Sequence, residues 1–348
     1  MAAVTHQGRA RSAFPSEAES LALKASLLDG DRALEAWRAL STPCGPEAAG
    51  IAWITPMLMT SVARLCPSDP WVAANPDFLK LASVRGRAVT RAGEKTLHQL
   101  EEAGIRTLAL KGLALGATVY PAPALRTVSD LDILVPRNDV FRAIECLKAG
   151  GLRSGFAEPK QVADLRKGHA HPFHAERRHG LGVDLHWHVL ASARGDGDDA
   201  SFWSGAQPAR VGSASTLVLC AEDQLLHVLV HGVRWTAAPH VRWVADAALI
   251  LRAASGSLSI PRFLESVVRF DVVTPVQEGL RFVDDLLGEG SALLKEVRQL
   301  KRSRFSQHAF KARATAYEER SLTDRVALRI ENALWSTRAR RNPGPSAR

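Results

Sequence analysis

Three aspartates have the spacing and the surroundings of a metal site. Asp130 and Asp132 lie two residues apart in the run Ser-Asp-Leu-Asp-Ile-Leu-Val, residues 129–135, whose aliphatic and β-branched residues predict a strand. Residues i and i+2 of a strand face the same side, and two carboxylates on one side repel each other unless a cation lies between them. Asp184 lies in a second predicted strand, residues 182–189. If these strands pair, three carboxylates converge, and they can hold two Mg²⁺ or Mn²⁺ ions that clamp a phosphoryl displacement.

The residues that precede these aspartates suit a polyphosphate. Residues 107–110 form a short β-prone run that ends at Lys111-Gly112, and a helix-like segment follows. Glycine lets a phosphate approach the backbone, and the first turn of a helix offers unpaired N–H groups to an anion. Lys111 and Arg126 carry the positive charge that a triphosphate needs, and Ser129 stands directly before the first aspartate. We therefore predict a nucleotide-binding set made of Lys111, Gly112, Arg126 and Ser129.

Together these motifs resemble the uncharacterised nucleotidyltransferase family of the DNA polymerase β-like superfamily. The resemblance covers about residues 100–250 and rests on Lys111-Gly112, Tyr120, Arg126, the run at residues 129–135 and Val183-Asp-Leu-His-Trp187. The helical stretches from Glu222 to His231 and from Arg242 to Asp246 resemble that family too. One departure is Lys111-Gly112, which stands where the wider superfamily usually has Gly-Ser after its first strand.

The resemblance implies a fold, an activity and a set of roles. The implied fold is α+β, with a small mixed-sheet core flanked by N-terminal and C-terminal helical regions. The implied activity is Mg²⁺-dependent (or Mn²⁺-dependent) transfer of a nucleoside monophosphate group from an NTP to an acceptor hydroxyl on a small molecule or a peptide natural product. Asp130, Asp132 and Asp184 would be the catalytic metal ligands, and Asp184 would also help to deprotonate the acceptor.

Three other functions remain open from the sequence. A non-catalytic nucleotide- or peptide-binding module could use the same fold, although the presence of all three aspartates argues against it. A phosphotransferase would move the γ-phosphate instead. A metallohydrolase would use the histidines, since His171 and His186 with a third ligand could bind zinc. His186 also shares the Asp184 face by its i+2 spacing, where it would orient a carboxylate or contact a phosphate.

A downstream histidine pair does not carry a zinc-protease motif. His227 and His231 are four residues apart on one predicted helix face. The protease motif requires Glu directly after the first His, and Val228 stands there, so packing is the expected role of the pair. Asp246 either pairs with Arg242, four residues earlier, or reaches the acceptor site, and the sequence leaves both roles open.

The periodicity of apolar residues divides the chain into five segments. They are a disordered lead-in (residues 1–16), an N-terminal helical region (17–103), the nucleotidyltransferase-like α/β core (104–215), a C-terminal helical region (216–335) and a disordered basic tail (336–348).

Three elements within these segments are expected in more detail. Residues 48–65 predict a helix with a kink at Pro56. Residues 77–103 predict the longest helix of the chain, with Gly104 in position to end it. Residues 171–189 predict a hairpin of two alternating strands.

The composition limits the class of protein and of partner. The 348 residues carry 45 Lys and Arg against 36 Asp and Glu, a formal net charge of +9, which favours anionic partners such as nucleotides. There are only two tyrosines, and the aromatic residues do not interleave with the basic clusters, so a stacking surface for nucleic acid is not expected. Four scattered cysteines, with no apolar run of membrane length and no signal-peptide pattern, lead us to expect a cytoplasmic protein.

Overall fold

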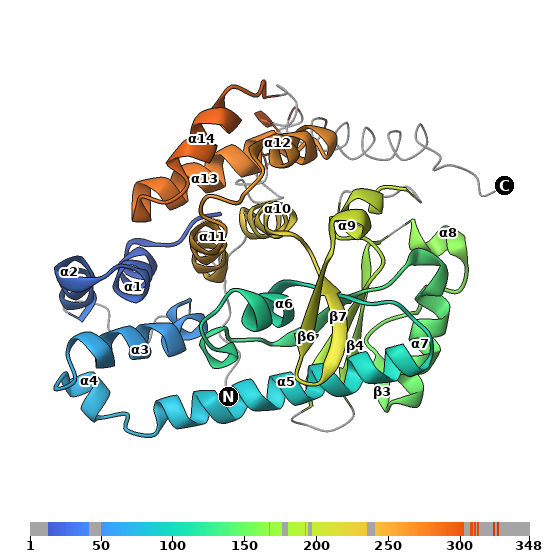
Figure 1. The fold of residues 1–348 in the computed structure, drawn as a ribbon, viewed down its shortest axis with the longest axis horizontal. Coiled ribbons are helices and arrows are strands. Elements are labelled where there is room, and N and C mark those ends of the chain that lie inside the picture. Colours follow the sequence, from blue (N-terminus) through green and yellow to red (C-terminus); the bar gives the residue numbers. More distant parts are fainter. Residues whose placement is uncertain are drawn as a thin grey trace. The chain divides into compact units, whose positions relative to one another are not determined.

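The computed structural model describes most of the chain, and Figure 1 shows its elements. The described residues are 13–41, 50–166, 168–175, 180–191, 193, 197–234, 241–302, 307, 308, 310, 312, 323 and 326. They belong to two compact units: residues 1–69 with 228–334, and residues 70–227 with 335–348. The lead-in before residue 13 and the basic tail lie outside the described residues. The segment limits expected from the sequence stay a prediction.

The first unit is made of helices. Its described helices are α1 (Glu17–Leu27), α2 (Gly30–Ser41), α3 (Thr55–Leu65), α11 (Arg242–Ala253), α12 (Ile260–Arg269), α13 (Val273–Leu287) and α14 (Ser291–Arg298), together with the end of α10 (Ala221–Gly232). Ser16 and Glu19 form a reciprocal capping box that fixes the start of α1. Phe14 packs against Trp243 and Phe282, with 5.1 Å between the ring centroids of Phe14 and Phe282. The N-terminal and C-terminal stretches that make up this unit therefore share one apolar core.

The start of α3 differs from the sequence prediction. A kinked helix was expected over residues 48–65, but the described part forms the 3₁₀ turn η1 (Ile51–Trp53) and then α3. Pro56 lies in the first turn of α3. In that position its missing N–H costs no helical hydrogen bond, and its fixed φ suits a helix start. Pro56 therefore begins a helix and does not bend one.

Within the described residues, the second unit is built on a seven-stranded mixed sheet. The strands are β1 (Leu108–Ala109), β2 (Asp130–Leu134), β3 (Leu152–Ser154), β4 (Ala170–Ala175), β5 (Gly182–His186), β6 (Gln207–Val211) and β7 (Ala214–Val218). Their order across the sheet is β3-β4-β5-β2-β1-β7-β6. β2 is parallel to β5, β1 is parallel to β7, and the other neighbours are antiparallel. The expected α+β fold, a mixed sheet with flanking helices, is confirmed.

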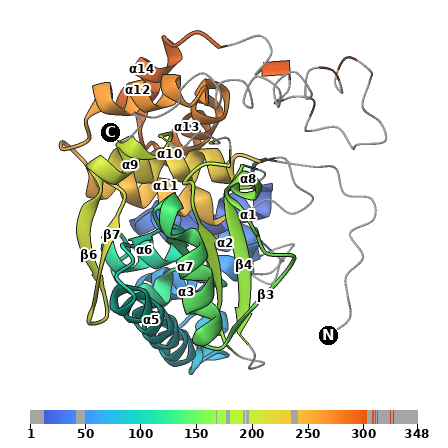
Figure 2. The ribbon, with the colours of Figure 1, turned by 90° about the vertical axis from the view of Figure 1, so that its right-hand side faces the viewer.

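The second unit also contains helices and 3₁₀ turns. The helices are α4 (Pro70–Ala73), α5 (Phe78–Glu102), α6 (Lys111–Thr118), α7 (Val140–Ala149), α8 (Val162–Leu165), α9 (Ala200–Gly205) and the start of α10, with the 3₁₀ turns η2 (Pro123–Leu125) and η3 (Arg137–Asp139). Of these, α5, α6 and α7 contact the strands. The long helix α5 packs against β7 and α7, as Figure 2 shows. Gly104 follows α5 at a φ of 67°, the left-handed conformation that ends helices, so its predicted role is confirmed.

Some strands were predicted and others were not. The expected hairpin is present as β4 and β5, which are antiparallel with Phe173 opposite Val183, while residues 176–179 at its tip lie outside the described residues. β6 and β7 form a second hairpin that turns at Gly212, whose φ is 61°. The sequence analysis missed this second hairpin and β3.

Alternation along β2 and β5 separates a core face from a polar face. Leu131 and Ile133 of β2, with Val183 of β5, belong to the buried apolar cluster that α5 and α7 complete. Successive strand residues point to opposite faces of a sheet. Asp132 and Asp184 therefore project from the face opposite that cluster, which leaves them free of the apolar packing that fixes both strands.

Candidate active site

Parallel pairing of β2 and β5 brings the carboxylates together. In the register of this pair, Asp132 lies opposite Asp184. Asp130 lies opposite Gly182, one pleat along the same face. The strand pairing on which the sequence argument depends is therefore present, and His186 joins the same face two residues after Asp184.

Asp132 is the buried centre of this group. Its Oδ1 accepts a hydrogen bond from the Nζ of Lys111 at 2.6 Å and lies 3.1 Å from the Nε2 of His186. Burial by itself raises the pKa of this carboxyl, but the hydrogen bond from His186 and the charge of Lys111 outweigh burial and hold the pKa well below its usual range. Asp132 is therefore ionised, although only 5% of its side chain is exposed.

Asp184 has the opposite character. Burial and, after it, the negative charge of Asp132 raise the pKa of Asp184, while the positive character of His186 opposes them. The side chain is half-buried. A carboxylate with a raised pKa is a stronger base than an ordinary one, so Asp184 is suited to accept a proton.

Three side chains of the site can hold a cation together. One ligand atom from each of Asp132, Asp184 and His186 lies within 4.8 Å of the other two. Carboxylate oxygens and an imidazole nitrogen are ordinary ligands of divalent ions, so this donor set fits a divalent cation. Asp130 is not part of this group, and its Oδ1 accepts a hydrogen bond from the Oγ of Ser129 at 2.7 Å. The structure therefore groups two of the predicted carboxylates with a histidine.

Lys111 reaches this cluster from the first residue of α6. Leu110, in extended conformation, precedes it, and Lys111 itself has a φ of 45°. A left-handed backbone at a residue other than glycine costs on the order of 1–3 kcal/mol and is found most often at functional sites. Lys111 has this backbone conformation, and its ammonium contacts Asp132. Among the described residues of the cluster, this lysine at the start of α6 carries the positive charge.

Gly112, the residue after Lys111, lies beside Arg126. A Cβ at Gly112 would stand 2.9 Å from the Cγ2 of Val128 and 3.4 Å from the Nη1 of Arg126, so a larger residue does not fit without movement. Arg126 is buried, and its Nη1 donates to the carbonyl oxygen of Thr127 at 2.7 Å. Lys111, Gly112 and Arg126 therefore lie together at the start of α6, while Ser129 is exposed directly before β2.

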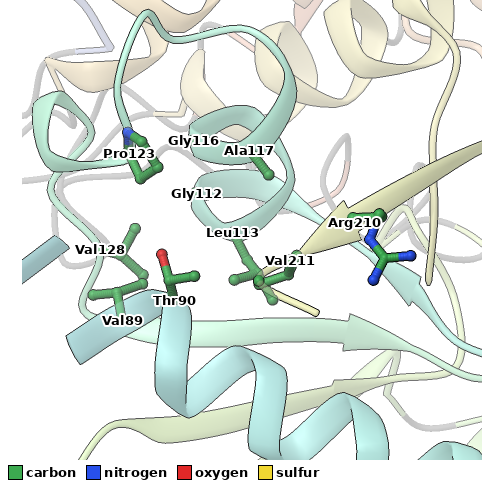
Figure 3. A pocket seen from close by; sticks show the side chains of 11 residues that line it. Val89, Thr90, Gly112, Leu113, Gly116, Ala117, Pro123, Val128, Arg210 and Val211 are labelled. Carbon is green, nitrogen blue, oxygen red and sulfur yellow. The ribbon is translucent and has the colours of Figure 1, made fainter. Parts of the chain in front are cut away.

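A pocket of about 160 Å³ lies on another side of Gly112 (Figure 3). Its walls come from α5, α6 and the β6–β7 turn, and it is lined by Val89, Thr90, Gly112, Leu113, Gly116, Ala117, Pro123, Val128, Arg210, Val211 and Gly212. None of the three clustered ligand residues lines it. This pocket is therefore separate from the carboxylate site and shares only Gly112 with it.

Two other histidines near the site have partners of their own. The Nε2 of His171 lies 2.5 Å from the Oγ of Ser154, which in turn donates to the carbonyl oxygen of Phe156 at 2.7 Å. His171 is thus not among the clustered ligands, although the zinc alternative required it. His188, just after β5, contacts Asp199 through its Nδ1, and the other oxygen of Asp199 accepts the Val189 N–H at 2.8 Å.

The sequence analysis missed the pair of His188 and Asp199. The two residues are 11 positions apart, and Asp199 follows a run of glycines and aspartates that reads as an ordinary turn. No spacing rule links a residue after a strand to one in such a loop. The pair was visible only once the backbone positions were known.

A family comparison decides the class of the protein. The model of a family described as uncharacterised nucleotidyltransferase matches residues 54–288, about two thirds of the chain. This chain belongs to that family. The match extends the resemblance expected from the sequence on both sides, into α3 and to the end of α13, and includes every carboxylate of the site.

Other comparisons add less. No curated protein matches the chain. Among solved structures, an antigenic nucleotidyltransferase-like protein from Paracoccidioides brasiliensis is similar at 12% identity over 60% of this chain and 93% of that chain, with a TM-score of 0.40. A likeness at that score carries no functional weight. Among the described helices, none has both the length and the apolar character required to cross a bilayer.

Proposed function

We propose that this nucleotidyltransferase-family member transfers a nucleoside monophosphate group from an NTP to an acceptor hydroxyl, with Mg²⁺ or Mn²⁺ as cofactor. The acceptor would be a small molecule or a peptide. The observation that carries the proposal is the register of β2 and β5, which sets Asp132 beside Asp184 in a group of ligand atoms within 4.8 Å of one another. Family membership supplies the reaction class.

The cation would be held by Asp132 and Asp184, with Asp130 beside them. A bound divalent ion supplies positive charge to the phosphate oxygens in the transition state and holds substrate and leaving group in line. The low pKa of Asp132 keeps this ligand ionised in a buried place. Asp130, which is less buried and hydrogen-bonded to Ser129, is available to a second ion or to the incoming nucleotide.

The transfer step balances with groups that the site provides. The acceptor oxygen forms a bond to the α-phosphorus, and the bond between that phosphorus and the oxygen bridging to the β-phosphate breaks. Pyrophosphate leaves with that electron pair. The hydroxyl proton of the acceptor would pass to the carboxylate of Asp184, which lies in register beside Asp132.

Lys111 and its neighbours would hold the triphosphate. The ammonium of Lys111 neutralises Asp132 at 2.6 Å, and it can exchange this contact for a phosphate oxygen when a nucleotide and its cation enter together. Gly112 allows a phosphate to approach the backbone at the start of α6, where the N–H groups have no helical partners. Arg126 and Ser129 complete the predicted contact set from the segment before β2.

Mass spectrometry of candidate acceptors, incubated with the full chain, MgCl₂ or MnCl₂ and each NTP in turn, tests the proposal. We expect a mass gain of one nucleoside monophosphate. Asp132→Asn should lower the rate by about 10³-fold or more, because a metal contributes several kcal/mol of charge stabilisation and each 1.36 kcal/mol is a factor of ten. Asp139→Asn is the matched control, since Asp139 lies in η3 and pairs with Arg142 away from the site.

The outcomes separate the rival functions. A mass gain of one phosphate assigns a phosphotransferase. Nucleotide binding in a calorimeter without turnover on any acceptor assigns a non-catalytic module. Full activity of the Asp132→Asn variant would remove the carboxylate site from the mechanism.

A further inference from the structure

His186 is the member of the cluster that the aspartate pattern alone does not explain. Its side chain is only 1% exposed, and His186 is the last residue of β5. Its Nε2 is 3.1 Å from the Oδ1 of Asp132 and belongs to the group of three ligand atoms with Asp132 and Asp184. The ring edge of His169, at 5.5 Å between centroids, packs against it. The imidazole is therefore fixed in place before any ligand arrives.

The second ring nitrogen of His186 indicates which tautomer a cation would meet. Its Nδ1 lies 3.4 Å from the carbonyl oxygen of His188, which can only accept a hydrogen bond. A proton on Nδ1 satisfies that carbonyl and leaves the lone pair on Nε2, directed at the carboxylates. Histidines that ligate metals almost always donate their other N–H to a carbonyl or carboxylate in this way.

The contact of Nε2 with Asp132 fits the same interpretation. This nitrogen and the Oδ1 of Asp132 lie 3.1 Å apart. A cation bound here would meet a nitrogen and an oxygen already directed at one point, with Asp184 in register beside them. Its binding would require that the Lys111 ammonium leave the shared oxygen.

We propose that His186 is a direct ligand of the catalytic cation, so that the first metal position has one imidazole nitrogen and the oxygens of Asp132 and Asp184. This inference rests on the proposed function for the presence of the metal. It adds a preference: imidazole suits transition-metal ions, whereas Mg²⁺ takes oxygen ligands. The site accordingly binds Mn²⁺ in preference to Mg²⁺, and His186 is the residue that sets the preference.

Metal titration of the full chain tests the preference without any acceptor. MnCl₂ and MgCl₂ are titrated calorimetrically into metal-free wild type, His186→Gln and His174→Gln. His174 is an exposed histidine on β4 and serves as the matched control. We expect His186→Gln to lower Mn²⁺ affinity by about 10–100-fold, the loss seen even when an outer partner of a metal-bound histidine is removed, and to change Mg²⁺ affinity much less. His174→Gln should leave both affinities unchanged.

A spectroscopic measurement on the wild type covers the case in which His186→Gln does not fold. Electron spin-echo modulation of the Mn²⁺-loaded full chain should show coupling to a directly bound ¹⁴N nucleus. Labelling all histidines with ¹⁵N should change that coupling, and His186→Asn, a shorter side chain, should abolish it.

Two failures are distinguishable. Bound Mn²⁺ without nitrogen coupling, together with equal losses of Mn²⁺ and Mg²⁺ affinity in His186→Gln, overturns the ligand role of His186 and leaves an all-oxygen site and the proposed function intact. If neither ion binds the wild type, with or without a non-hydrolysable NTP analogue, the metal site fails and the proposed function fails with it.

Discussion

Two buried histidines only two residues apart, His186 and His188, contact carboxylates in different surroundings. Asp199 has one oxygen on His188 and the other on the Val189 N–H, so both of its oxygens have a protein donor. Asp132 has Lys111 and His186 on a single oxygen, and a second carboxylate, Asp184, lies opposite it. Both oxygens of Asp199 are therefore satisfied, although the Nε2 of His188 is buried without a hydrogen-bond partner in the described structure. Asp132, in contrast, shares one oxygen between two donors and faces a second carboxylate.

This difference is the one expected between a structural contact and the proposed binding site. A buried carboxylate whose oxygens are satisfied by the protein stabilises the fold and has no place for a ligand. A pair of carboxylates in which the pKa of one is raised by burial and by the charge of the other is less stable without a ligand, and such arrangements concentrate at functional sites. The same strand end thus holds both kinds of group. The contacts of Asp199 with His188 and Val189 fix the backbone just after His186. The position of His186 in the carboxylate cluster depends on that backbone.

Asp199→Ala should have the largest effect on stability. Removing one partner of a buried hydrogen-bonded pair leaves the other partner unsatisfied, and such losses cost about 1–3 kcal/mol. Urea unfolding followed by circular dichroism measures the change. Asp199→Asn should cost less, because its amide oxygen still accepts the Val189 N–H. Equal stability of wild type and Asp199→Ala would mean that the pair has no structural role.

Asp184→Asn should change stability in the opposite direction. In metal-free protein, the amide removes the repulsion between Asp184 and Asp132, and substitutions that relieve such a site commonly add roughly 0.5–2 kcal/mol to the free energy of unfolding. The same variant should lose cation binding. Unfolding in EDTA and in MnCl₂ gives both results: the variant gains in EDTA, and only the wild type gains further from Mn²⁺. A destabilised Asp184→Asn in EDTA contradicts the view that the cluster is strained.

Glu278→Gln should have the smallest effect on the free energy of unfolding, because this carboxylate is only partly buried. In the helical unit, Glu278 is only partly buried and accepts from Arg302 at 2.7 Å and Arg281 at 2.8 Å. Burial raises the pKa of Glu278, but the hydrogen bonds from the two arginines together lower it below its usual range. The folded pKa lies below the unfolded one, so the stabilisation is present above the unfolded pKa and is lost as pH falls through the folded pKa.

The variant should therefore be less stable than the wild type by less than about 1 kcal/mol near pH 7, as is usual for exposed ion pairs. The difference should disappear in acid, where the wild-type carboxyl is protonated. Urea midpoints from pH 7 down to pH 3 measure it. A difference that grows as pH falls would contradict the direction of the pKa shift.

The sequence predicted the parts of this site that follow from local pattern. Strand alternation placed Asp130 and Asp132 on one face, and the second strand brought Asp184, because the period of two fixes which side chains share a face. The pattern could not tell which of these side chains would join the ligand cluster. That His186 lies in the ligand cluster while Asp130 bonds Ser129 depends on side-chain geometry, which spacing does not encode.

Elements that depend on long-range contacts were harder to predict. β6 carries Pro208, and its strand character comes from pairing with β7 and not from its own residues. A kink at Pro56 was expected because proline disrupts helix interiors, but proline is also common in the first turn of a helix, where Pro56 lies. The pair of His188 and Asp199 joins a strand end to a loop, so it required the folded backbone.

The left-handed backbone of Lys111 restricts how this site can evolve. Glycine would relax the φ of 45°, but it would remove the ammonium that neutralises Asp132. Most other uncharged residues would keep the strain and lose the charge as well. A lineage that changes residue 111 must therefore first change what balances Asp132, so the two positions are expected to vary together among descendants of this sequence.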